Sequence, residues 1–378
     1  MRWSTHLLVL ALVALMASSA DAQIPPNVRL GIERFEGDAR TAREVRRSLR
    51  QSLAWIHDVR LDFRQPEVNL SGEVRGDAED RRVLLSMTSA EGALLFEREF
   101  PWGGAADANR VADVLVYELT GRPGPFSTQL LFARREGRGQ KAIFMSQWDG
   151  TALSQVSPSD EIAMLPSFVF GEVWYSVMQT NGLMSVTRAG EPVFSSRSGL
   201  NMGVQQCGER LLFTSSRSGD PEVYSAAADG SDLLRLTHHA AIDVSAACGP
   251  NEKVAFVSDR SGIPQLYMLD TPDAEPRQLT FGRRQSQTPV FCSDGERDLL
   301  AYTQVGRRMR VVVRNLRSGQ ETTISPGWGS FKDPAFSPDC RLLAYVAVGR
   351  GVFVSKVDQP RRRRQVLRGA AETIRWGP

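Results

Sequence analysis

The sequence lacks the local motifs that mark most hydrolases, nucleotide-binding proteins and metalloenzymes. It contains no Gly-x-Ser-x-Gly nucleophile elbow, no phosphate-binding glycine loop, no His-Glu-x-x-His helix and no EF-hand. Histidine is scarce, and the adjacent His238 and His239 would point to opposite faces of an extended segment, which disfavours a shared metal ion. We therefore predict that the protein is not an enzyme and has no cofactor and no metal site.

Lysine is also rare: it supplies only four of the 46 basic residues, and arginine supplies the rest. The 43 acidic residues nearly balance them, for a formal net charge of +3. This composition indicates the base composition of the gene rather than a nucleic-acid partner. The run Arg361–Arg364 is interpreted as a solvated hairpin loop rather than a site for nucleic acid or an anionic surface.

Long hydrophobic runs are limited to one, near the N-terminus. Leu7–Met16 follows Arg2 and precedes Ala20-Asp-Ala22, a small-x-small cleavage site, which predicts a secretory signal peptide over residues 1–22. The run is too short to span a membrane, no later stretch could do so, and no lipobox cysteine follows it. We expect cleavage after Ala22 and a location in the periplasm, with membrane association only through partners.

An internal repeat runs through the C-terminal two-thirds of the chain. Three pairs of matching residues each lie 43 positions apart: Arg217 and Arg260, Tyr224 and Tyr267, Thr237 and Thr280. Short hydrophobic runs between Gly, Pro and Asp turns at this period are typical of a β-propeller with one four-stranded blade per repeat. In the fifth copy, the predicted inner strand is Pro289–Phe291, with the proline tolerated only at its start.

The two ends of the repeat region complement each other. The first copy begins at Leu131 with the equivalent of a second strand and lacks an inner strand of its own. Ile374–Trp376 aligns with Pro334–Phe336, the inner-strand segment of the sixth copy. We therefore expect the C-terminal strand to complete the first blade and close a ring of six blades over residues 126–378. Closure would remove exposed sheet edges.

Residues 23–125 are predicted to form a separate small α/β domain. A strand is expected at Val28–Ile32, and Thr41–Glu44 has the capping-box pattern that opens a helix with one hydrophobic face. Short strands and a second amphipathic helix at Arg110–Leu119 follow. The predicted fold class is mainly β, with a C-terminal six-bladed β-propeller preceded by this α/β domain.

All four cysteines fall in or next to the same turn of the repeat: Cys207, Cys248, Cys292 and Cys340. Export would permit disulfides, and neighbouring blades could bring Cys207 to Cys248, or Cys248 to Cys292. The alternative, which we favour here, is that they are buried free thiols at a position that accepts small residues. The sequence has no Cys-x-x-Cys pair and no spaced histidine partner, so no zinc site is predicted.

The signal peptide, the α/β domain and a propeller with Pro-x-Phe-Ser-Pro-Asp and Leu-Thr repeats together resemble the TolB family of periplasmic propeller proteins. The most specific likeness is the domain junction, where a helix ends in Leu119-Thr-Gly121 and Gly124-Pro-Phe126 leads to the propeller strand at Leu131. The ending Trp376-Gly-Pro378 is similar as well. The resemblance covers nearly the whole mature chain.

The resemblance implies a non-enzymatic scaffold of the Tol–Pal system, which maintains outer-membrane integrity and helps to constrict the envelope at cell division. The implied partner is the peptidoglycan-associated lipoprotein Pal. In the family, a longer segment before the first strand engages the inner-membrane protein TolA. Only Gln23–Asn27 precedes Val28 here, so the resemblance does not carry a TolA-like partner over to this chain.

In the family, loops that lead into the inner strands help to line the mouth where Pal docks. On this basis we predict partner binding by three rim loops, with these candidate residues: His238, His239, Asp243, Arg283, Arg284, Gln287, Thr288, Trp328, Phe331 and Lys332. Two other hypotheses stay open. The chain could be an exported propeller that binds a different envelope protein, or a propeller enzyme with a polar cluster in its channel.

Overall fold

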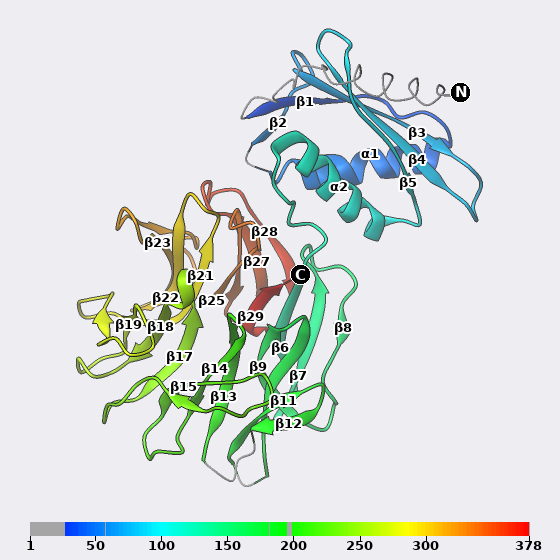
Figure 1. Cartoon of the computed structure of the whole chain (residues 1–378). Coiled ribbons are helices and arrows are strands. Elements are labelled where there is room, and N and C mark those ends of the chain that lie inside the picture. The colour runs from blue at the N-terminus through cyan, green and yellow to red at the C-terminus, as the bar shows by residue number, and fades with distance from the viewer. Residues whose placement is uncertain (1–26, 57, 181, 195–198, 378) are drawn as a thin grey trace, which may run out of the picture.

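The computed structural model describes residues 27–56, 58–180, 182–194 and 199–377, which form an N-terminal domain followed by a β-propeller (Figure 1). The predicted signal peptide, its cleavage after Ala22 and His57 lie outside the described residues. The predicted fold class is confirmed, since the protein is mainly β with a small α/β domain before the propeller. No helix among the described residues is long and apolar enough to cross a membrane.

The N-terminal domain is a five-stranded sheet with two helices. In spatial order the strands are β2 (Val59–Leu61), β1 (Val28–Ile32), β3 (Val68–Arg75), β4 (Arg82–Ser89) and β5 (Leu94–Pro101). β1 is parallel to both neighbours, whereas β3, β4 and β5 are antiparallel. Alternate residues of β3 and β4 are buried, because one face of the sheet packs against α1 (Ala39–Leu53) and α2 (Ala105–Thr120) (Figure 1).

The start of α1 differs from the prediction. The helix begins at Ala39, two residues before the expected capping box at Thr41. Asp38 is the N-cap, and its carboxylate accepts a hydrogen bond of 2.9 Å from the Thr41 backbone N–H. Aspartate is as effective an N-cap as serine or threonine, so the earlier residue takes this role.

The propeller has six four-stranded blades. Blade 1 contains β29 (Glu372–Gly377), β6 (Gln129–Gly137), β7 (Gln140–Gln147) and β8 (Ser154–Gln155). Blade 2 contains β9 (Ile162–Val169), β10 (Glu172–Met178), β11 (Met184–Arg188) and β12 (Glu191–Phe194), and blade 3 contains β13 (Asn201–Cys207), β14 (Arg210–Ser215), β15 (Glu222–Ala226) and β16 (Leu234–Arg235).

The remaining blades follow the same order from inner to outer strand. Blade 4 contains β17 (Asp243–Cys248), β18 (Val254–Ser258), β19 (Gln265–Leu269) and β20 (Arg277–Gln278). Blade 5 contains β21 (Gln285–Ser293), β22 (Asp298–Val305), β23 (Met309–Asn315) and β24 (Glu321–Thr323). Blade 6 contains β25 (Phe331–Phe336), β26 (Leu342–Ala347), β27 (Gly351–Lys356) and β28 (Arg363–Arg368).

The C-terminal strand closes the ring in the predicted way. β29 pairs antiparallel with β6, with Trp376 opposite Leu130 and Arg375 opposite Leu131. The C-terminus therefore lies beside the first propeller strand (Figure 1). This pairing covers the edge that β6 would otherwise expose.

Every inner strand carries one β-bulge at the same place. Two inner-strand residues lie opposite one aromatic residue of the second strand, and the first of the two has a φ between 47° and 70°. The bulges begin at Leu165, Gly203, Ser245, Thr288, Asp333 and Thr373, and the aromatic residues opposite them are Tyr175, Phe213, Phe256, Tyr302, Tyr345 and Phe132.

The bulges explain the Pro-x-Phe motif and correct one prediction. Pro289 and Pro334 occupy the second bulge position, where the ladder is interrupted and a missing N–H is tolerated. Pro289 does not start its strand as predicted, because β21 already begins at Gln285.

Two disulfides join neighbouring blades. Cys207–Cys248 links blades 3 and 4, and Cys292–Cys340 links blades 5 and 6. The first pair is one of the two pairings considered from the sequence. The favoured hypothesis of free thiols is wrong, and so is the pairing of Cys248 with Cys292. Cys340 lies in the turn after the inner strand of blade 6, which places its Cα 5.7 Å from that of Cys292.

The two domains share one continuous hydrophobic core. Residues of α2, such as Leu115, belong to the same buried cluster as Leu342 and Val354 of blade 6. The linker is held to α2, because the Asp113 carboxylate accepts hydrogen bonds of 2.8 and 2.7 Å from the backbone N–H groups of Phe126 and Ser127. Burial nevertheless raises the pKa of Asp113 above its usual value.

Candidate functional site

The N-terminal domain occupies one side of the propeller and leaves the other side uncovered. Its contacts go to turns between first and second strands, at Glu296 and Arg341, and to connections between third and fourth strands, at Trp148 and Lys356. The loops between second and third strands, and those between consecutive blades, lie on the opposite side of the disc because strand direction alternates. We call this side the free face. All three predicted rim loops belong to it.

The structure divides the ten candidate residues into two groups. Five lie in loops of the free face and are exposed: His238, His239, Arg283, Arg284 and Trp328. The other five belong to inner strands rather than to loops: Asp243, Gln287, Thr288, Phe331 and Lys332. The predicted loops were too long, because each inner strand begins several residues before the motif that identified it.

Two of the strand residues have structural roles that keep them from a partner. Asp243 is fully buried, and its carboxylate accepts a hydrogen bond of 2.7 Å from Arg260. Burial raises the pKa of Asp243. Phe331 is also fully buried, where it packs against Trp328, Tyr345 and Phe353. Neither side chain is therefore accessible to a binding partner.

The strand residues Gln287, Thr288 and Lys332 are only partly buried, and each has a partner within the propeller. The Gln287 amide donates to Gln285 at 3.1 Å, and the Thr288 hydroxyl lies 2.7 Å from that of Thr303. Lys332 pairs with Asp333 at 3.1 Å. The Thr288 contact joins β21 to β22 at the bulge, whereas the contacts of Gln287 and Lys332 lie within a single inner strand.

The histidine loop rests on a buried carboxylate. Glu222 is fully buried, and it accepts hydrogen bonds from the His239 backbone N–H at 2.8 Å and from the Arg235 guanidinium at 2.5 Å. The His239 ring is held by its Nδ1, which accepts a hydrogen bond of 2.9 Å from the Ala241 N–H. The His238 side chain is exposed beside it. Glu222 thus holds a loop that presents two imidazoles to solvent.

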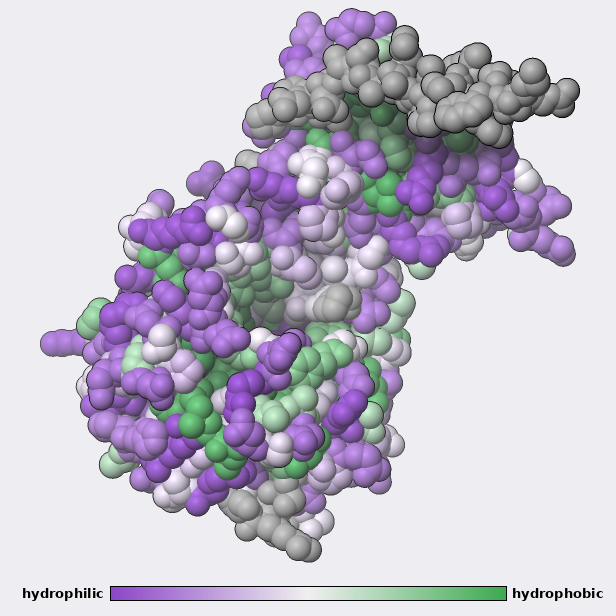
Figure 2. Space-filling view, viewed as in Figure 1, coloured by the Kyte–Doolittle hydropathy of each residue, from purple (hydrophilic) through white to green (hydrophobic). Residues whose placement is uncertain are grey.

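Together with Phe281, Trp328 is one of the exposed aromatic groups of the free face. Its side chain is 40% exposed, and its inner edge rests on Phe331 with ring centroids 5.0 Å apart. The Arg350 guanidinium lies over the indole, 4.9 Å from the ring centroid. Tryptophan and arginine are both among the residue types enriched at the energetic centre of protein interfaces. Figure 2 shows hydrophobic residues among the hydrophilic surface of the propeller blades.

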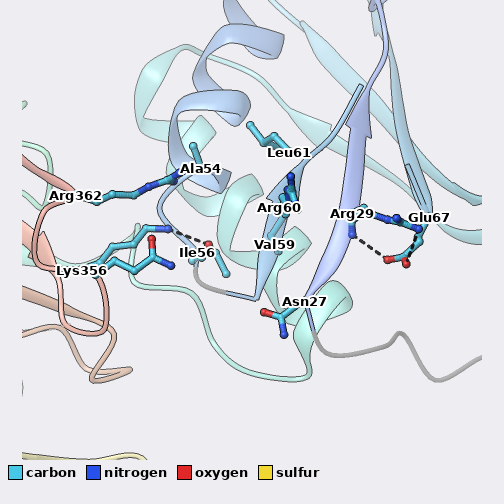
Figure 3. A pocket seen from close by; sticks show the side chains of 11 residues that line it. Asn27, Arg29, Ala54, Ile56, Val59, Arg60, Leu61, Glu67, Lys356 and Arg362 are labelled. Atoms are coloured by element: carbon cyan, nitrogen blue, oxygen red, sulfur yellow. Dashed lines mark hydrogen bonds and ion pairs between the residues drawn. The ribbon is translucent and has the colours of Figure 1, made fainter. Parts of the chain in front are cut away.

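The contact side of the propeller contains a cationic cleft between the domains (Figure 3). Its volume is about 780 Å³, and its lining includes Arg29, Arg60, Lys356 and Arg362, with Glu67 as a carboxylate paired to Arg29 at 3.0 Å. Lys356 is 4% exposed and donates to the Ile56 carbonyl at 3.1 Å. Burial lowers the pKa of Lys356 to about 8. The sequence did not single out this lysine, because nothing local predicts that it contacts the segment after α1.

The arginine run Arg361–Arg364 is only partly the solvated loop that the sequence predicted. Arg361 and Arg362 are exposed, but Arg364 is half-buried between the domains. Its guanidinium carbon lies 4.6 Å from the Trp148 ring centroid and 5.6 Å from that of Trp55. Arg364 lies in β28 and contacts Trp148 of blade 1 and Trp55 of the N-terminal domain, so its guanidinium contributes to the contact between the domains.

Within the described ranges, no three His, Cys, Asp or Glu residues are grouped so that they could hold a metal ion. The comparison with protein families is decisive: the family described as the TolB beta propeller domain matches residues 116–378. The chain belongs to the TolB family. The match begins inside α2 and includes the whole propeller, so the resemblance noted from the sequence is confirmed.

Individual TolB relatives match a smaller part of the chain. The chain is 28% identical to the TolB homolog of Chlorobium luteolum over 171 residues, which are 43% of this chain and 39% of that protein. It is 30% identical to the Tol-Pal system protein TolB of Anaeromyxobacter dehalogenans over 182 residues, 44% of this chain and 37% of that protein. The aligned segments thus span well under half the length of these relatives.

The structure of TolB from Acinetobacter baumannii is similar to nearly the whole chain. The TM-score is 0.74 and the sequence identity is 19%, over 93% of this chain and 98% of that chain. At this identity the likeness establishes the fold alone. It supports both the propeller and the preceding α/β domain.

Proposed function

We propose that the chain is a non-enzymatic scaffold of a Tol–Pal system, exported to the periplasm, that binds a Pal-like peptidoglycan-associated lipoprotein through the free face of its propeller. Through this partner it would contribute to outer-membrane integrity and to envelope constriction at cell division. Membership in the TolB family supports the system. The observation that carries the binding site is the uncovered face with a half-exposed Trp328 held between Phe331 and Arg350.

The free face is suited to a protein partner because buried side chains beneath its loops fix their conformation. Glu222 fixes the histidine loop, and Phe331 supports Trp328, so little ordering would be needed on binding. Imidazole, guanidinium and indole groups also offer hydrogen bonds and apolar area together. This arrangement favours a specific protein surface over a small metabolite.

Isothermal titration calorimetry of the mature chain with the soluble domain of the Pal-like lipoprotein from the same organism tests the proposal. We expect binding, and we expect a His238→Ala, Arg284→Ala, Trp328→Ala variant to lose at least tenfold in affinity, about 1.4 kcal/mol. Phe331 is left intact because its removal would disturb the fold. Arg361→Ala on the contact side is the control, and it should bind like the wild type. Absence of binding by the wild type would reject the proposed function.

A further inference from the structure

One sector of the free face is strongly basic and has no acidic residue of its own. The four free-face loops around blades 5 and 6 contain five arginines and neither Asp nor Glu: residues 279–284, 306–308, 324–330 and 348–350. Loops of other blades on the same face do hold acidic residues, among them Asp160, Asp220 and Asp259. The four loops around blades 5 and 6 thus combine several arginines with no acidic residue.

The arginines of this sector surround a hollow of about 360 Å³. Arg284, Arg307, Arg308 and Arg310 line it together with Gln304 and Gly306. Arg284 comes from the loop between blades 4 and 5, and the others belong to the hairpin of blade 5. Among the residues that the structure describes, no hydrophobic side chain lines the hollow, which therefore suits charged groups rather than an acyl chain.

None of these arginines forms a salt bridge with a carboxylate of the described residues. Two of them donate to neutral acceptors: Arg284 donates to the Gln304 amide oxygen and Arg308 to the Gly327 carbonyl, both at 2.9 Å. These bonds aim the guanidinium groups without neutralising them. Four exposed cations around one hollow repel one another, and an anion placed among them would relieve that repulsion.

We propose that this hollow receives an acidic segment of the protein partner, with two or more Asp or Glu carboxylates inserted among the four guanidinium groups and Trp328 serving as the adjoining apolar anchor. The inference rests on the proposed function and specifies the chemistry of the partner. Guanidinium groups match carboxylates in bidentate geometry, which adds specificity to the charge attraction. The contact would be concentrated on blades 5 and 6 rather than spread around the ring.

Charge reversal at Arg307 and Arg310, whose side chains form no hydrogen bond within the described part of the chain, tests this inference. In the calorimetric assay with the lipoprotein domain, Arg307→Glu with Arg310→Glu should weaken binding at least tenfold. The matched control is Arg135→Glu with Arg138→Glu, which makes the same charge change in the β6–β7 hairpin of blade 1 on the same face and should change affinity by less than about twofold. Wild-type affinity should also fall as NaCl is raised.

Two probes separate the sources of negative charge. One is a ten-residue peptide of alternating Glu and Ser, compared with its Gln counterpart, and the other is a phosphatidylglycerol vesicle. We expect the Glu peptide, and not the Gln peptide, to bind the wild type and to lose binding in the Arg307→Glu, Arg310→Glu variant. Vesicle binding that depends on these arginines, without binding of the Glu peptide, would assign the hollow to phosphate headgroups and overturn the inference.

The outcomes also separate this inference from the proposed function. Equal partner binding by the wild type and the Arg307→Glu, Arg310→Glu variant would overturn the acidic-segment inference and leave the proposed function standing. An arginine-dependent Glu-peptide complex without any lipoprotein binding would reject the proposed partner and support the acidic-segment chemistry. If neither the lipoprotein domain nor the Glu peptide binds, both are rejected.

Discussion

The Trp376 indole donates a hydrogen bond of 2.6 Å to the Thr128 hydroxyl, which joins the last propeller strand to the residue just before the first. The same closure is reinforced by a 2.6 Å ion pair between Lys141 and Glu372. Ile374, at the centre of β29, is fully buried. The last strand therefore contributes to the stability of the first blade as well as completing its sheet.

Deletion of residues 373–378 should destabilise the whole propeller. The loss of Ile374 burial alone should lower the free energy of unfolding by about 2 to 5 kcal/mol, and the uncovered edge of β6 should promote association. Trp376→Phe, which removes the indole donor and keeps an aromatic ring, should lower the free energy of unfolding by at least about 1 kcal/mol. Thermal melting with light scattering measures both effects. A truncated chain that stays monomeric with an unchanged melting temperature would contradict ring closure by β29.

The two disulfides should each stabilise the propeller by about 4 kcal/mol, since they close chain segments of 41 and 48 residues. Replacing Cys207 and Cys248 by serine, or Cys292 and Cys340, should lower the urea midpoint to a similar degree. A reductant should destabilise the wild type and have no effect on the variant with four serines. Reaction of the native, unreduced protein with a thiol reagent would show that the bridges are absent.

Arg364 should contribute to the docking of the two domains. Arg364→Ala removes a guanidinium that lies on Trp148 and Trp55, and we expect a loss of about 1 to 2 kcal/mol together with faster proteolysis of the linker around residues 121–125. Arg361→Ala is the matched control, because Arg361 is exposed in the same run. Identical proteolysis of the two variants would mean that the stacked arginine has no role in docking.

Lys356 predicts a pH dependence of stability. Its folded-state pKa of about 8 lies below the unfolded value near 10.5, so the unfolded chain binds the proton more tightly between these values. The contribution of this group should therefore rise with pH, by about 2 kcal/mol between pH 7 and pH 10. Stability of the wild type relative to Lys356→Met, measured by urea unfolding, should increase over this range. A constant difference between the two proteins would show that the lysine is not held in a desolvated site.

The repeat, the blade number and the closing strand could be predicted because they depend on local patterns that recur. Tyr224 and Tyr267 match in the sequence repeat, and in the structure each pairs with the outer strand of its blade at the same position. The bulge at Pro289 could not be predicted from the sequence. The inner-strand residues that precede the Pro-x-Phe motif have no distinctive composition, so the strand was predicted to begin at the proline. For the same reason, Asp243 and Phe331 were assigned to loops although they belong to inner strands. Both side chains are buried, and the sequence could not show this because their burial depends on packing against neighbouring blades.

Contacts between segments far apart in the chain could not be predicted from the sequence for a different reason. Cys340 is three residues later in the repeat than the other cysteines, and only the turn geometry of blade 6 brings it to Cys292. From the sequence, Arg364 could not be distinguished from the other three arginines of its run, because its contact with Trp148 depends on the packing of blade 6 against blade 1. In the sequence, the loop arginines of blade 5 do not differ from those of any arginine-rich surface. The hollow that they line forms only where two loops pack together.

Hydrogen–deuterium exchange of the chain with and without the Pal-like lipoprotein domain tests the central claim most directly, because it reports which side of the propeller the partner covers. We predict slower exchange in the free-face loops at residues 238–242, 279–284, 306–308 and 324–330, with no change in the turns at Glu296 and Arg341 on the contact side. Protection confined to the contact side, or absent from every loop under saturating partner, would contradict docking on the free face.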